Sequence, residues 1–204
     1  MLFSKRLRSL DLFTFMRNPI YQEGNEKTAG KPIPGWLAEE SAELAGPMSG
    51  FAMSFRAPSI VAQGFDESLG RYALFEDYDA SLGIMKRQLI VKANKARVFH
   101  NKWPQKRTSG LEWGAITVLN RAFIVCKHSR LGSPARRNLL PYSTYQCLRY
   151  LAQANTSYGR QRLKGALRAL RHVRPLLASP RESLVATYVG ARESCLGRPA
   201  DRAG

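Results

Sequence analysis

The chain has 204 residues, of which 44% are hydrophobic, which suits one domain with an appendage and excludes global disorder. Its formal net charge of +17 is uneven, because residues 1–100 hold 13 Lys and Arg against 11 Asp and Glu, whereas residues 101–204 hold 19 against 4. The charge is the only sign of a nucleic-acid partner, since no recognition motif and no platform of interleaved basic and aromatic residues accompanies it. We therefore expect no nucleic acid among its partners.

The sequence favours a cytoplasmic protein, in contact at most with the inner face of a membrane. Residues 1–18 are basic and amphipathic but lack the continuous apolar run of a secretory signal. The most apolar stretch, residues 115–126, contains Asn120 and Arg121 and is shorter than the roughly 20 residues of a membrane span. The three cysteines have no CxxC spacing, which favours reduced thiols over a disulfide framework or a zinc site.

Residues 1–49 are predicted to be a remnant or connecting segment. The run 20–35 is dense in Gly, Pro and polar residues, as loops are. A short acidic helix is expected at 36–46, because Gly46 and Pro47 end the pattern.

Residues 50–110 alternate strand-like and helix-like patterns at short spacing, which is typical of α/β proteins. A buried strand is expected at 50–56. Pro58 can begin a helix that stops at Gly64.

After a turn-rich loop at 65–75, a helix is expected from Glu76. Four apolar side chains share one face of this helix: Tyr78, Leu82, Met85 and Leu89. The run LIVKANKARVFH then predicts two short strands around Asn94 and Lys95.

The remainder of the chain reads as basic amphipathic helices over residues 111–178 and a flexible tail over 179–204. The helices are expected at 111–128, 136–153 and 159–178. In the last of them Leu163, Leu167, Leu170, Val173 and Leu177 form an apolar stripe among arginines and a lysine.

An acidic cluster, Glu76-Asp77-Tyr78-Asp79, lies at the start of the helix predicted from Glu76. One interpretation is capping, because carboxylates in a first turn stabilise a helix by roughly 0.3–1 kcal/mol each. The other is catalysis, because the same position keeps a carboxylate ionised, as a general base requires.

Four motifs in order resemble the acceptor-side half of family 2 glycosyltransferases of the GT-A fold. They are Met53-Ser54-Phe55-Arg56, Gln63-Gly64-Phe65-Asp66-Glu67, Glu76-Asp77 and Val98-Phe99-His100. The resemblance implies an α/β fold: part of a GT-A-like, Rossmann-like sheet, followed by amphipathic C-terminal helices. Residues 50–110 would be the acceptor-side half of the catalytic domain.

The resemblance also implies a chemistry. Asp77 would be the general base of an inverting reaction, in which an acceptor hydroxyl displaces a nucleoside diphosphate, and Glu76 would orient the acceptor. Arg56 and Asp66 become candidates for substrate binding, although an arginine beside a strand end also suits an ion pair.

His100 becomes a candidate ligand for a divalent metal, Mg or Mn, although a histidine at a strand end also suits a structural hydrogen bond. Trp103 and Arg107 follow it in a loop that could close over the donor, or that is simply a surface loop. Asp77 and Asp79 spell DxD, but the family's donor DxD lies upstream of the MSFR motif, so Asp79 is expected to be a residue of the helix turn.

Because the donor-binding half with its DxD is missing ahead of residue 50, we expect a fragment, one part of a split enzyme or a degenerate relative, with a metal only where that half is supplied. The expected function is transfer of a sugar from a nucleotide-sugar donor to a glycan or lipid-linked acceptor. The alternative is a catalytically inactive relative that binds a partner or an anionic membrane surface through its basic helices.

Overall fold

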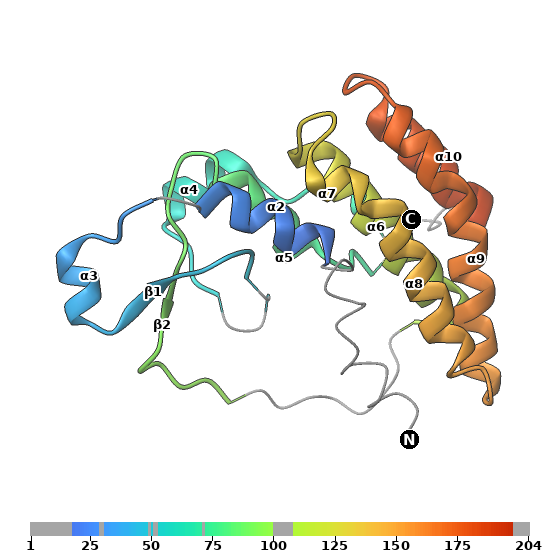
Figure 1. Ribbon diagram of the computed structural model, residues 1–204, viewed down its shortest axis with the longest axis horizontal. Helices are drawn as coiled ribbons and strands as arrows, with labels where there is room; N and C mark the ends of the chain where they lie inside the picture. The colour runs from blue at the N-terminus through green and yellow to red at the C-terminus, as the bar shows by residue number, and fades with distance from the viewer. Residues whose placement is uncertain are drawn as a thin grey trace, which may run out of the picture. The chain divides into compact units, whose positions relative to one another are not determined.

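The computed structural model describes residues 18–28, 31–48, 50, 53–70, 72–99 and 108–197 (Figure 1). The chain forms two compact units. The N-terminal unit comprises residues Ile20–Lys106, and the helical unit comprises Met1–Pro19 together with Arg107–Gly204.

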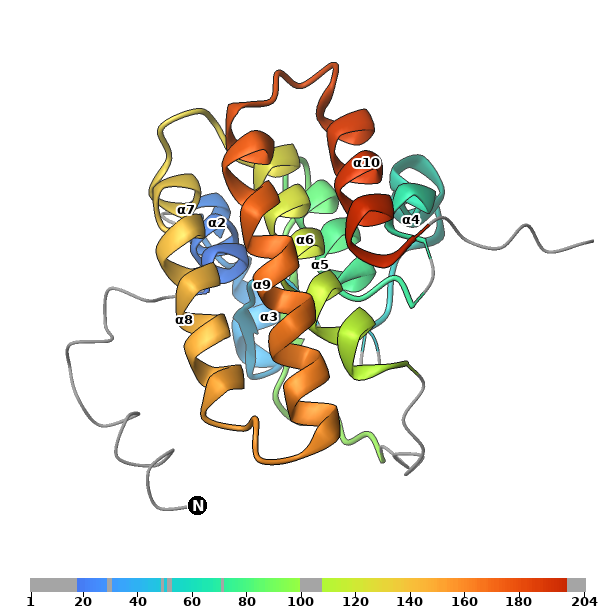
Figure 2. The same ribbon diagram turned by 90° about the vertical axis from the view of Figure 1, so that its right-hand side faces the viewer.

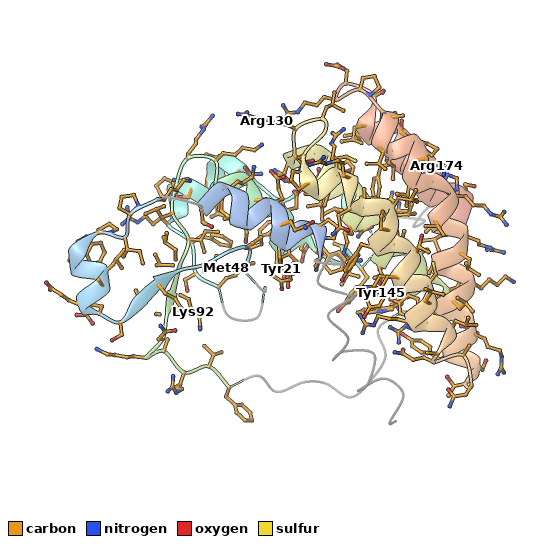
Figure 3. The ribbon with its side chains drawn as sticks, viewed as in Figure 1. Tyr21, Met48, Lys92, Arg130, Tyr145 and Arg174 are labelled. Carbon is orange, nitrogen blue, oxygen red and sulfur yellow. The ribbon has the colours of Figure 1, made fainter. Side chains whose placement is uncertain are left out.

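The N-terminal unit contains short helices and one pair of strands. Its elements are α2 (Pro19–Thr28), α3 (Gly35–Glu39), β1 (Ala42–Leu44), α4 (Ala57–Gln63), a 3-10 helix (Glu67–Leu69), α5 (Glu76–Ile84) and β2 (Val91–Ala93). β1 and β2 are antiparallel, with Glu43 opposite Lys92 and an ion pair of 2.8 Å between these two side chains. Figure 3 shows Lys92 beside this pair of strands.

α4 packs on α5, and their contact contributes to the core of the N-terminal unit. Leu69, Leu82 and Met85 are buried, so the 3-10 helix and α5 both supply apolar side chains. The Ser59 hydroxyl at the start of α4 donates a hydrogen bond of 2.7 Å to Oε1 of Gln88, just beyond α5. These contacts fix the C-terminal end of α5 against α4 and the 3-10 helix.

The expected α/β fold with a Rossmann-like sheet is wrong. Of the described residues, 63% are helical and only 4% lie in strands, and these strands form a single antiparallel pair, not a parallel sheet. The strand predicted at 50–56 is also absent, because residues 53–56 have no regular structure. An extended segment becomes a strand only when its backbone groups pair with a neighbour, and no strand pairs with 53–56 in the described part of the chain.

Several local predictions for this unit are confirmed and others are wrong. α4 has Pro58 in its first turn and Gly64 at its C-cap, where φ is +65°, and α5 begins at Glu76 as expected. The acidic helix predicted at 36–46 is shorter, because its second half forms β1. Of the two strands predicted around Asn94, only the first, β2, is present.

The helical unit is built around α9. Its elements are α6 (Gly110–His128), α7 (Pro134–Arg137), α8 (Leu139–Leu151), α9 (Ser157–Ala178) and α10 (Leu184–Leu196). α9 contacts α6, α8 and α10, and Figure 2 shows it in front of α6, between α8 and α10. One face of α9 is thus packed against three helices and the opposite face is open to solvent.

Glycines allow α6 and α9 to approach closely. A Cβ placed on Gly114 would lie 1.9 Å from the carbonyl oxygen of Arg162, and one on Gly165 would lie 2.0 Å from that of Leu111. No larger residue fits at either position without moving backbone. The two helices therefore pack backbone against backbone.

This packing corrects the expected apolar stripe of α9. Of the expected stripe, Val173 is fully buried. The other buried residues of α9 are mostly small and lie outside the stripe, namely Gly159, Gly165, Ala166, Ala169 and Leu176. Leu167, a member of the expected stripe, is 46% exposed. The close approach to α6 leaves room for glycine and alanine but not for a row of leucines.

The C-terminal segment expected to be a flexible tail contains α10. Tyr188 of α10 is fully buried and stacks on Phe123 of α6 with ring centroids 4.4 Å apart. Its hydroxyl donates a hydrogen bond of 2.7 Å to Oδ1 of Asn120.

Among the helices of the described residues, none combines the length and the apolar composition needed to cross a bilayer.

Candidate functional site

The Glu76-Asp77 pair occupies the first turn of α5, where the sequence places it. The two residues that lead into this turn have an unusual backbone: φ is +46° at Ala73 and +74° at Phe75. Positive φ is uncommon for residues with a side chain, and such strain gathers at functional sites. The backbone therefore turns sharply just before the acidic pair.

Asp77 is held by backbone N–H groups. Its Oδ2 accepts a hydrogen bond of 2.7 Å from the N–H of Gly50, and its Oδ1 accepts one of 2.9 Å from the N–H of Tyr78. Each carboxylate oxygen has a second lone pair, so Asp77 retains the capacity to accept a proton. Two N–H donors at the start of α5 thus fix the position of this carboxylate.

Ser81 connects the first turn of α5 to Met48. Its hydroxyl donates 2.7 Å to the carbonyl oxygen of Asp77 and accepts 3.2 Å from the N–H of Met48. Together with the bond from Gly50, these bonds tie Met48 and Gly50 to the start of α5. Nothing in the sequence signals this role for Ser81, because its partner lies 33 residues away.

Tyr78, the residue after Asp77, contacts Tyr21 of α2. The hydroxyls of Tyr21 and Tyr78 are 2.8 Å apart, and their rings meet edge to face with centroids 5.6 Å apart (Figure 3 labels Tyr21). Tyr78 also meets the ring of Phe75 at 5.7 Å. The sequence predicted Tyr78 for the apolar face of α5, but it did not indicate Tyr21 of α2 as its partner.

Glu76 differs from Asp77 in its surroundings. Partial burial, and then the negative charge of Asp77, raise the pKa of Glu76 above its ordinary value. The side chain nevertheless remains exposed to solvent. The two adjacent carboxylates thus have different environments.

Asp79 lies inside α5 and is fully buried. It therefore has no open coordination position, in agreement with its expected place in the helix turn. In the part of the chain that the structure describes, no three His, Cys, Asp or Glu residues gather into a group that could hold a metal ion. The Mg or Mn expected with the missing donor-binding half stays a prediction, because its candidate ligand His100 is not among the residues searched.

The two predicted substrate-binding residues lie in separate surroundings. Oδ1 of Asp66 caps the 3-10 helix by accepting from the N–H of Ser68 at 2.9 Å and from its hydroxyl, so this side chain has a structural role. Arg56 is exposed just before α4. No hydrogen bond or ion pair between the described residues joins either side chain to Asp77.

Arg56 instead lines a cavity of about 560 Å³ in the N-terminal unit. Its other polar and aromatic lining includes Trp36, Ser54, Phe55 and Gln88. Trp36 is 61% exposed at this cavity. Neither Glu76 nor Asp77 lines it, so the structure does not bring together the arginine and the acidic pair.

Three predicted site residues lie outside the described residues: the candidate metal ligand His100 and the candidate donor-loop residues Trp103 and Arg107.

Comparison of the chain with protein-family models, with curated proteins and with solved structures found no match. Any functional assignment therefore depends on the residues themselves.

Proposed function

We propose that this chain supplies the acceptor-side base of a glycosyltransferase that uses a nucleotide-sugar donor, with Asp77 as that base. The observation that carries the proposal is the fixed carboxylate of Asp77, which accepts from the N–H groups of Gly50 and Tyr78 at the start of α5. Its sequence context, the ordered motifs from Met53 to Phe99, supports the same interpretation.

In this mechanism an acceptor hydroxyl attacks the anomeric carbon of the sugar. A carbon–oxygen bond forms to the acceptor, the bond to the nucleoside diphosphate breaks on the opposite face, and the hydroxyl proton passes to Asp77. The N–H groups of Gly50 and Tyr78 hold the Asp77 carboxylate in place for this transfer. Glu76, the adjacent carboxylate of the same turn, orients the acceptor.

The proposal assigns donor binding to residues outside the described part of this chain, either in another segment or in a partner protein. The acceptor is a glycan or a lipid-linked sugar. The mechanism requires no parallel sheet among the described residues, since it depends on a carboxylate at a helix N-terminus and on the loop that holds it.

The test of transfer uses the cells that make the chain, because these also make any donor-binding partner. Membranes from cells with and without the coding sequence are incubated with a panel of labelled nucleotide sugars. We expect one sugar whose incorporation is lost on deletion and is restored when the full chain is supplied again. Equal incorporation of every sugar by both membranes would contradict the proposal.

A further inference from the structure

The exposed side of α9 is strongly basic. Residues 108–197 contain 14 Lys and Arg against 3 Asp and Glu, and α9 contains no acidic residue. Five exposed cations lie on one side of this helix at spacings of three and four residues: Arg160, Lys164, Arg168, Arg171 and Arg174. We call these five residues and Leu167 the α9 face; Figure 3 labels Arg174 on it.

Leu167 lies in the middle of this basic surface. Counting 100° per residue, it falls between Arg160 and Arg174 on the helical wheel, and it is 46% exposed. Leu163 and Leu170, beside it on the wheel, are only partly buried. A single exposed leucine is ordinary at a protein surface, but a leucine flanked by cations suits a partner that offers both negative charge and an apolar layer.

We propose that the α9 face docks on an anionic lipid surface. Phospholipid head groups supply negative charge opposite the five cations, and the acyl boundary beneath them accepts an apolar side chain such as Leu167. The packed side of α9 fits this orientation, because Gly165 and Ala169 hold it against the other helices while the α9 face stays open. The inference is independent of the proposed sugar transfer.

A polyanion such as RNA offers charge but gives no reason for the exposed leucine. Single-stranded nucleic acids are bound by aromatic side chains on which bases stack, and the α9 face contains none. Membrane docking therefore explains both the cations and Leu167.

The experiment measures sedimentation of the full chain with vesicles of phosphatidylcholine alone and of phosphatidylcholine mixed equally with phosphatidylglycerol. We expect binding to the mixed vesicles only, weakening as salt is added. Lys164→Gln with Arg171→Gln should lower the affinity about tenfold or more, because each cation near the surface contributes substantially. The lysine and the arginine make no hydrogen bond or ion pair with other described residues, so their loss leaves the fold intact.

The matched control is Arg87→Gln with Lys95→Gln, which removes the same charge from exposed positions of the N-terminal unit. This variant should bind the mixed vesicles like the unmodified chain. Equal weakening by the two double variants would overturn the proposal, since binding would then follow net charge and not the α9 face.

Leu167→Ala separates a membrane from other polyanions. It should weaken binding to mixed vesicles by at least about fivefold, because three carbon atoms of this side chain no longer enter the lipid and full insertion of each is worth about 0.8 kcal/mol. Val185→Ala, at an exposed valine of α10, is the control and should have no such effect. Binding to an RNA oligonucleotide with no binding to vesicles, or vesicle binding unaffected by Leu167→Ala, would contradict the docking of this face on lipid.

Discussion

Cys126, Cys147 and Cys195 are free thiols buried at separate places in the helical unit. Burial raises the pKa of each to about 11 from an ordinary value of 9.0. Since the folded protein holds these protons up to a higher pH than the unfolded chain does, the free energy of unfolding should fall as pH rises from about 9 to about 11.

The same burial predicts slow alkylation. At pH 8 only about one thiol in a thousand is ionised when its pKa is 11, and the side chains are also inaccessible. We expect all three cysteines to react with iodoacetamide at least about 100-fold more slowly in the native protein than in urea. Mass spectrometry of the labelled peptides gives the three rates, and rapid native labelling of any one cysteine would contradict its burial.

Single residues were predictable from the sequence only when their partners were close in the chain. Pro58 and Gly64 mark the ends of α4 because local backbone geometry determines where such residues fit. Asn120 was recognisable as a polar interruption of an apolar run, but its partner Tyr188 is 68 residues away. A hydrogen bond over that separation depends on helix packing, which local patterns do not specify.

At the scale of elements, the contact between α6 and α9 makes a sharp prediction. Gly114→Ala places a Cβ where the carbonyl of Arg162 lies, and neither backbone can move without separating the helices. We expect the free energy of unfolding to fall by about 2–4 kcal/mol, as measured by urea denaturation.

The control is Gly190→Ala in α10, because a Cβ there meets nothing within 4 Å. Alanine favours helix over glycine by about 1 kcal/mol, so this variant should be slightly more stable than the unmodified chain. If Gly114→Ala were as well tolerated as Gly190→Ala, the close crossing of α6 and α9 would be wrong.

The positions of most helices could be predicted, whereas their packed faces could not. Periodicity and capping residues predict α5, α6, α8 and α9 to within a few residues, because these signals are local. The pattern of α9 predicted an apolar stripe, but hydrophobicity alone does not say which residues of the stripe another helix covers. Close helix contacts instead select small residues, and Leu167 remains at the surface.

At the scale of the molecule, the expected α/β fold depended on four motifs in the order found in another family. Such motifs report on loops and helix starts, and these are present: α4 follows Arg56, and α5 begins at Glu76. They do not report on a sheet, whose strands need partners from distant parts of a chain. The site pair Glu76-Asp77 was therefore locatable from the sequence, while the fold around it was not.

The measurement that tests the central claim most directly is sugar transfer by Asp77→Asn in the full chain, supplied to the source-cell membranes that lack it. The account predicts a loss of at least about 100-fold, because the amide cannot take the acceptor proton. Glu39→Gln, an equivalent change at an exposed position of α3, should transfer sugar at the unmodified rate. Transfer by Asp77→Asn at the rate of Glu39→Gln would contradict the assignment of Asp77 as the base.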